Sequence, residues 1–237
     1  MNVSPPSSSV TVWLARVEPS PAADALAAAY AVLDPYERQR AAAVLKETTR
    51  TAFIFAHALT RWALSTRGSV APADWRFGRE SSGKPFVTGP AASGLSFNIS
   101  HTDGLITCAV AGGEPVGVDV ECVRRPVDVR LFERVLSAAE RAELAGLADD
   151  AQRRRFYAIW TAKEAYAKAT GRGVSEALRD MTVDTAEGQP TLIGVDAIWR
   201  VHRIDAGADH SVAVAVQAER KIDVHHIRCD AWPPIPA

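Results

Sequence analysis

The order of hydrophobic and polar residues along the first half of the chain predicts a strand, three helices and a β-hairpin. Asp34 followed by Pro35 is typical of a helix start, because aspartate caps the first turn and proline fits the first helical position. Gly68 is a natural helix stop. The expected elements are the strand Val10–Val17, the helices Ala22–Leu33, Pro35–Leu45 and Thr49–Thr66, the turn Ser81–Pro85, and the strands Leu95–Ile99 and Leu105–Ala111 around the hairpin turn His101–Gly104.

A similar order of elements follows in the second half. The strand Val116–Glu121 comes first, and Ser137 with Glu140 has the spacing of a capping box that opens a helix to Ala148. The long helix Asp150–Ala169 should end at Gly171. Four further strands are expected over Thr182–Thr185, Thr191–Ile193, Ile198–Ile204 and Ser211–Gln217.

Because both halves run from a strand through helices to further strands, the chain is expected to be an α+β protein of two pseudo-symmetric α/β halves. Residues 10–113 form the first half and 114–237 the second, and residues 1–9, rich in serine and proline, are expected to be disordered. The sequence contains no strong internal repeat, so the equivalence rests on element order. Two such halves, each supplying one wall of a cleft, predict a monomer.

The composition excludes several classes of protein. Hydrophobic residues make up 47% and charged residues 23%, and the net charge of −1 lacks the basic excess of a nucleic-acid binder. No apolar run approaches the roughly 20 residues of a membrane span, and the N-terminus lacks the features of a signal peptide. Cys108, Cys122 and Cys229 are scattered without zinc spacing, which favours buried free thiols in a reducing compartment. We therefore expect a cytoplasmic protein.

Two segments carry carboxylates at spacings that place them on one face. Asp119 and Glu121 are two residues apart on a strand, whereas Glu164 and Lys168 are four apart on a helix that also carries Trp160. If the helix packs on the strand, three carboxylates converge beside an ammonium group. Such hard oxygen ligands suit Mg²⁺, which completes its shell with water and phosphate oxygens. The alternative is a solvent-facing edge strand and an exposed glutamate–lysine pair.

Ser100 and His101 end a strand, and as neighbours they point to opposite faces. They are therefore badly placed as a nucleophile and its base, and a pair that contacts phosphate is favoured, with a structural histidine as the alternative. Short basic clusters such as Arg38 with Arg40 suit either a phosphate-bearing ligand or a solvated helix face.

Taken together, these motifs resemble the surfactin-synthetase-type (Sfp-type) 4′-phosphopantetheinyl transferases. The resemblance is carried by Gly83-Lys84-Pro85, Phe97–His101, Gly117–Glu121 and Trp160–Lys168. It implies the fold of that family, with coenzyme A bound in a cleft between the halves. It also implies transfer of 4′-phosphopantetheine to a serine of an acyl or peptidyl carrier protein, releasing 3′,5′-ADP.

The resemblance further implies a role for each matched residue. Asp119, Glu121 and Glu164 would hold Mg²⁺, or Mn²⁺ with similar ligand preferences. Glu164 would accept the serine proton, with Glu121 acting through a bound water as the next candidate, and Lys168 would offset charge on the leaving nucleotide. Coenzyme A contacts are expected from Arg40, Arg50, Gly83, Lys84, Pro85, Ser100, His101, Asp119 and Lys168. Residues 122–150 are a candidate docking surface for the carrier.

Two other functions use the same residues. A Mg²⁺-dependent phosphoesterase would direct water rather than a carrier serine at the phosphorus, and coenzyme A cleavage without a carrier would identify it. A non-catalytic binding protein of this fold would not require Asp119, Glu121, Glu164 and Lys168 together.

Overall fold

The computed structural model describes residues 9–90, 94–127, 134–171, 176–185, 188–219 and 222–234. Residues 1–8 of the expected disordered segment therefore lie outside the described residues, as do residues 128–133 of the candidate docking surface. The elements of the first half are β1 (Ser9–Arg16), α1 (Ala23–Ala31), α2 (Pro35–Ala43), α3 (Glu47–Gly68), the short 3-10 helix η1 (Pro72–Asp74), β2 (Arg76–Arg79), β3 (Pro85–Gly89), β4 (Ser96–Thr102) and β5 (Leu105–Ala111). Those that follow are β6 (Val116–Cys122), α5 (Ala138–Ala145), α6 (Asp149–Thr170), η2 (Glu176–Arg179), β7 (Thr182–Asp184), β8 (Thr191–Ile193), β9 (Trp199–Ile204), β10 (His210–Gln217) and β11 (Asp223–Cys229).

The helix starts predicted at Asp34 and Ser137 are confirmed, whereas α3 begins at Glu47, two residues before the expected Thr49, and α2 and α5 end two and three residues before the expected Leu45 and Ala148. Asp34 and Glu37 form a complete capping box at α2, and Ser137 and Glu140 form a second one at α5. Helix α3 runs through Gly68 and ends at Ser69, which takes the left-handed conformation with φ 49°. Gly68 serves close packing instead, because a Cβ there would lie 2.6 Å from the Trp75 ring.

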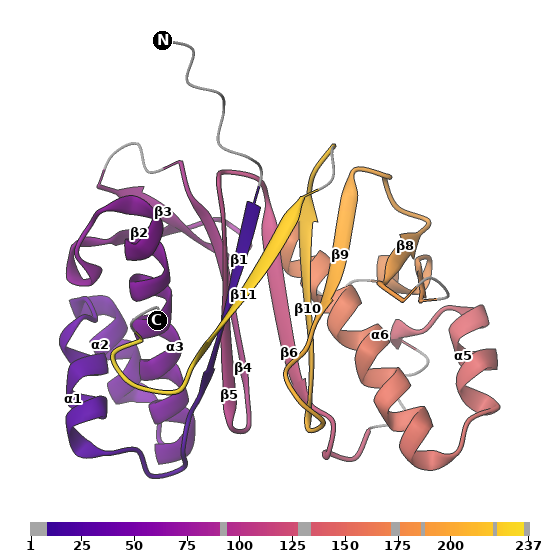
Figure 1. Ribbon diagram of the computed structural model, residues 1–237, viewed down its shortest axis with the longest axis horizontal. Helices are drawn as coiled ribbons and strands as arrows, with labels where there is room; N and C mark the ends of the chain where they lie inside the picture. The colour runs from indigo at the N-terminus through magenta and orange to yellow at the C-terminus, as the bar shows by residue number, and fades with distance from the viewer. Residues whose placement is uncertain are drawn as a thin grey trace.

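Two β-sheets form the middle of the molecule, with α1–α3 outside one and α5 and α6 outside the other (Figure 1). The strand orders are β11-β1-β5-β4 and β6-β10-β9. In the first half, β1 pairs with β5, and β5 pairs with β4. In the second half, β6 pairs with β10, and β10 pairs with β9 in the same way. This shared order, β1-β5-β4 and β6-β10-β9, supports the predicted equivalence of the two halves.

Three hydrophobic clusters follow from side-chain alternation along the strands. Alternate residues of β1 point to opposite faces, so Val12 packs between the two sheets while Trp13 packs on the helices of the first half. In β6 the same alternation sends Val118 and Val120 into the layer between the sheets. The opposite face of β6 meets α6, whose Ala162 and Ala165 belong to the third cluster.

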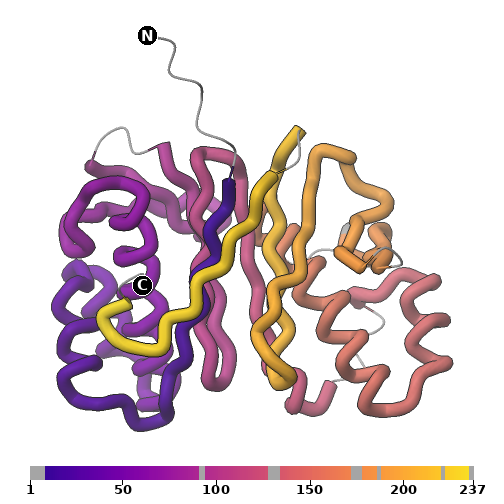
Figure 2. The backbone as a smooth tube through the Cα atoms, viewed as in Figure 1, coloured from indigo at the N-terminus to yellow at the C-terminus, as the bar shows by residue number. Residues whose placement is uncertain are grey.

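Three strands of the structure were not predicted from the sequence. Strand β11 follows the last expected strand and pairs in parallel with β1, so the chain returns to the first sheet, where yellow runs beside indigo in Figure 2. Its sequence of mixed charged and apolar residues has no clean period. Strands β2 and β3 form a separate hairpin around the predicted turn Ser81–Pro85, and β2 has only four residues.

None of the described helices is both long and apolar enough to cross a membrane.

The β4–β5 hairpin turn is tighter than predicted. Strand β4 continues through His101 and Thr102, which pair with β5, and only Asp103 and Gly104 form the turn. Gly104 has φ 78°, a conformation that glycine adopts without strain. His101 therefore has the fixed direction of a strand residue.

Candidate functional site

The end strands of the two sheets, β4 and β6, are joined by side chains. Asn98 Oδ1 accepts a hydrogen bond of 3.0 Å from the backbone N–H of Val118. Thr102 Oγ1 accepts one of 3.3 Å from the backbone N–H of Cys122. Asn98, Ser100 and Thr102 share one face of β4 because strand side chains alternate. Ser100 therefore also faces β6.

Helix α6 crosses β6 in direct contact with Gly117. A Cβ at this position would lie 2.1 Å from the carbonyl oxygen of Ala165 and 2.4 Å from the backbone nitrogen of Ala169. Only glycine permits so close an approach. It brings the face of α6 that carries Glu164 and Lys168 over the carboxylates of β6, as the sequence pattern predicted.

The polar side chains at this crossing form a compact network. Lys168 Nζ lies 2.6 Å from Asp119 Oδ1 and donates a hydrogen bond of 2.9 Å to Ser100 Oγ. The Ser100 hydroxyl in turn donates to Asp119 Oδ1 over 2.9 Å. Glu121, which follows Asp119 on the same face of β6, accepts a hydrogen bond of 3.3 Å from Trp160 Nε1 at its Oε1. Ser100, Asp119 and Lys168 thus meet from three different elements.

Three carboxylates share this site with one ammonium group. Burial and repulsion by Asp119 raise the pKa of Glu164 to about 7, although Lys168 opposes the shift. Burial and Asp119 also raise the pKa of Glu121. Asp119 Oδ2 and Glu164 Oε1 are buried without a hydrogen-bond partner. The site therefore holds excess negative charge and two oxygens available to a ligand.

The network opens into a cleft of about 630 Å³ whose walls come from both halves. Predicted site residues that line it are Arg40, Pro85, Ser100, His101, Asp119, Glu121, Glu164 and Lys168. The structure adds residues that the sequence did not single out, among them Phe53, His57 and Arg79. Phe53 and His57 are four apart on α3, a spacing that marks one helix face. Arg79 had no such signal, because its short strand was not expected.

Three predicted site residues lie outside this lining. Lys84 Nζ donates to the carbonyl oxygens of Ala169 and Val116, over 2.7 and 3.3 Å. Gly83 has φ 86° at the tip of the β2–β3 turn, a conformation that favours glycine. Arg50 lies in the first turn of α3.

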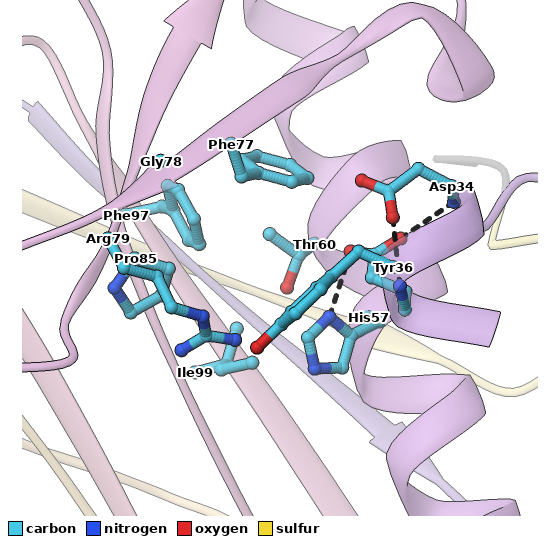
Figure 3. Close-up of a pocket in the computed structure, with 11 residues that line it drawn as sticks. Asp34, Tyr36, His57, Thr60, Phe77, Gly78, Arg79, Pro85, Phe97 and Ile99 are labelled. Atoms are coloured by element: carbon cyan, nitrogen blue, oxygen red, sulfur yellow. Dashed lines mark hydrogen bonds and ion pairs between the residues drawn. The ribbon is translucent and has the colours of Figure 1, made fainter. Parts of the chain in front are cut away.

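A smaller pocket of about 230 Å³ adjoins the cleft (Figure 3). Its walls include the rings of Tyr36, Phe77 and Phe97, and Figure 3 shows the Tyr36 ring lying between His57 and Arg79. The Arg79 guanidinium lies 5.4 Å from the Tyr36 ring centroid. Residues shared with the cleft are His57, Arg79, Pro85 and Ile99.

Two residues in the wall of this pocket, Glu37 and His57, belong to a network that includes the buried Arg61. Glu37 Oε1 lies 2.9 Å from His57 Nδ1, and Glu37 Oε2 lies 2.8 Å from the buried Arg61 guanidinium. Burial alone would raise the pKa of Glu37, but His57 and Arg61 outweigh it and lower the pKa. Glu37 is therefore paired with the Arg61 guanidinium and in contact with His57, whereas Arg40 lines the cleft.

Lys163, the other lysine of the Trp160–Lys168 motif, has a different environment from Lys168. Lys163 is fully buried, and its Nζ lies 2.6 Å from Glu140 Oε2. It also donates hydrogen bonds of 2.8 Å to the carbonyl oxygens of Val135, Leu178 and Met181. Lys163 therefore fastens α6 to the surrounding chain, whereas Lys168 faces the cleft.

Comparison with known proteins gives matches over both halves. Residues 18–113 match the family model of the N-terminal part of 4′-phosphopantetheinyl transferases, and residues 115–216 match that of the 4′-phosphopantetheinyl transferase superfamily. The chain is 32% identical to the 4′-phosphopantetheinyl transferase HetI of Nostoc sp. over 169 residues, which cover 70% of this chain and 71% of HetI. It is 31% identical to the transferase Sfp of Bacillus subtilis over 125 residues, 53% of this chain and 54% of Sfp.

The match to Sfp thus spans about half of the length of that relative. Among solved structures, the chain is similar to a holo-(acyl-carrier-protein) synthase from Bacillus anthracis in complex with CoA (3′,5′-ADP). The identity is 27% over 44% of this chain and 96% of the synthase, with a TM-score of 0.38. The matches to the family models and to HetI agree with the resemblance of the motifs: the chain belongs to the Sfp-type 4′-phosphopantetheinyl transferases, enzymes that transfer the 4′-phosphopantetheinyl group from coenzyme A to carrier proteins.

Proposed function

We propose that the cleft between β4, β6 and α6 is the active site in which this chain transfers 4′-phosphopantetheine from coenzyme A to a carrier serine. The observation that carries the proposal is that the buried carboxylates of Asp119 and Glu164 line the same cleft as Lys168, at the junction of the two halves. It combines anionic oxygens without partners and a cation within one cleft. Phosphoryl-type transfer depends mainly on such positioning and electrostatics.

Asp119, Glu121 and Glu164 would hold a divalent cation, with Mg²⁺ as the first candidate. The donor set fits, because Asp119 Oδ2 and Glu164 Oε1 are hard oxygens without hydrogen bonds. Among the described residues no three acidic, histidine or cysteine side chains already form a metal cage. Mg²⁺ does not require one, since it commonly keeps waters and binds substrate phosphates beside one or two carboxylates. When bound, it would neutralise negative charge on the pyrophosphate.

The nucleotide end of coenzyme A is assigned to the first-half wall. Arg40, Arg79 and His101 place cationic or hydrogen-bonding groups along the cleft. The adjoining pocket offers the aromatic walls of Tyr36 and Phe77, which suit a planar base. Lys168, which contacts Ser100 and Asp119, is assigned to the pyrophosphate.

The reaction requires one bond to form and one to break. The carrier serine oxygen forms a bond to the β-phosphorus of coenzyme A, and the bond from that phosphorus to the bridging oxygen breaks. The serine proton passes to the carboxylate of Glu164, which lines the cleft from α6. Lys168 offsets the charge that develops on the departing 3′,5′-ADP. No covalent enzyme intermediate is needed.

Intact mass spectrometry of apo-carriers tests this function. Carriers of the fatty-acid, polyketide and nonribosomal-peptide types are incubated with the protein, coenzyme A and Mg²⁺. We expect at least one to gain the mass of one 4′-phosphopantetheinyl group, and its serine-to-alanine variant to gain none. Chelation of the metal should stop the reaction. Cleavage of coenzyme A at equal rates without any carrier would instead identify a phosphoesterase.

Gly117→Ala should lower transfer by about 100-fold or more, because it displaces α6 and a misplacement of about 1 Å can have that effect. The clash is with the backbone of α6 at Ala165 and cannot be relieved by turning a side chain. Steady-state kinetics with a responsive carrier measures the loss. The control is Gly146→Ala at the end of α5, where φ is −87° and an added Cβ would lie 3.6 Å from the carbonyl oxygen of Glu143, an ordinary contact. Retention of full activity by Gly117→Ala would show that the crossing of α6 is not needed in this form.

A further inference from the structure

The tip of the β2–β3 hairpin is fastened to the end of α6. Lys84 comes from the hairpin, and its Nζ donates to the carbonyl oxygen of Ala169 over 2.7 Å and to that of Val116 over 3.3 Å. Ala169 lies in the last turn of α6, where carbonyl groups lack partners within the helix. An ammonium group there also complements the negative end of the helix dipole. One side chain of the first half thus bonds to two elements of the second half.

A second contact joins the same two segments. A Cβ on Gly171, the residue that ends α6, would lie 3.5 Å from Glu80 Oε2 and 3.6 Å from Ser82 Oγ. The hairpin tip therefore packs directly on the helix end. The tip is itself braced, because the Ser82 hydroxyl donates to Glu80 Oε2 over 3.3 Å and the backbone N–H of Glu80 donates to the carbonyl of Lys84 over 2.9 Å.

The β2–β3 hairpin also forms part of the wall of the cleft. Arg79 in β2 and Pro85 in β3 line both the cleft and the adjoining pocket. Among the described strands, β2 and β3 are hydrogen-bonded only to each other and belong to neither main sheet. Their position therefore depends on side-chain contacts, such as the Phe77–Phe97 ring pair with centroids 5.2 Å apart, and on the contact made by Lys84.

We propose that Lys84 is a positioning residue: it holds the β2–β3 hairpin, which forms part of the cleft wall assigned to the nucleotide, at a fixed distance from α6. Glu164 and Lys168 lie on α6, and Arg79 and Pro85 lie on the hairpin, so the Lys84 contact couples the two sides of the cleft. In this role the lysine acts through the hairpin and not by touching a coenzyme A phosphate. The kinetic part of the inference rests on the proposed function of the cleft, whereas the structural part does not.

The test compares Lys84→Met, which keeps the aliphatic stem but loses the donor, with Lys84→Arg, which keeps a cationic donor. Hydrogen–deuterium exchange is measured on the ligand-free protein. We expect Lys84→Met to raise exchange in residues 76–89 and 165–171, and Lys84→Arg to restore most of the protection. The KM for coenzyme A should rise about 3- to 10-fold in Lys84→Met, with kcat within about twofold of the parent, the loss expected for one charged hydrogen bond acting indirectly. Lys46→Met, an exposed lysine in the loop before α3, is the control for lost charge.

Two results would overturn the proposal. Unchanged exchange in ligand-free Lys84→Met would do so, whatever its KM. A KM increase for coenzyme A much larger than that for 3′-dephospho-coenzyme A would show that the lysine contacts the 3′-phosphate itself. If the parent protein modified no carrier, the proposed function would fail, and the exchange measurement would still decide whether Lys84 holds the hairpin.

Discussion

Glu164→Gln is expected to lower the single-turnover rate of 4′-phosphopantetheinyl transfer by about 100- to 10,000-fold, the usual contribution of a general base. Glutamine keeps the shape of the side chain but can neither accept the serine proton nor offer an anionic oxygen to a metal. Glu164 Oε1 is buried without a partner, so the substitution breaks no hydrogen bond at that atom. Rapid-quench kinetics over a series of Mg²⁺ concentrations measures the effect, and circular dichroism checks the fold.

Lys168→Ala is the matched variant one helical turn away. An ammonium group cannot ligate Mg²⁺, so the Mg²⁺ dependence should change little while turnover falls through lost stabilisation of the leaving group. If additional Mg²⁺ fully restored Glu164→Gln, Glu164 would be a ligand only, and Glu121 acting through a bound water would be the next candidate base. Normal turnover of Lys168→Ala would remove the lysine from the chemistry despite its contact with Asp119.

Lys163→Met should reduce the free energy of unfolding by about 3–5 kcal/mol, the typical cost of removing one partner of a buried ion pair. Methionine fits the space of the aliphatic chain but leaves the buried Glu140 carboxylate without its cation. Three carbonyl oxygens lose a donor as well. Urea unfolding followed by circular dichroism measures the loss.

The double variant Lys163→Met/Glu140→Gln identifies the cause of that loss. Removing both charges should recover part of the stability, because no unpaired carboxylate remains. Recovery should be incomplete, since Glu140 also accepts hydrogen bonds from the backbone N–H groups of Ser137 and Val183. A loss below about 1 kcal/mol in Lys163→Met, similar to an exposed ion pair, would contradict the proposed role of this lysine in fastening α6.

Local patterns in the sequence were sufficient to predict which side chains share a face. Asp119 and Glu121 were predicted to share one face of a strand, and both line the cleft, while Val118 and Val120 pack between the sheets. The four-residue spacing of Glu164 and Lys168 likewise predicted a shared helix face, and both line the cleft. The capping box of α5 was predictable for the same reason, because Ser137 and Glu140 are three residues apart.

Only the tertiary structure decided which distant segments these faces meet. The side-chain bonds from β4 to β6, the contact of Lys84 with the end of α6 and the return of β11 to β1 join residues far apart in the chain. The lysines at 163 and 168 look alike in the sequence, yet one is buried on Glu140 and the other reaches Asp119. The physical reason is that backbone periodicity sets the direction of a side chain, whereas its partner is set by how separate elements pack, which no local pattern records.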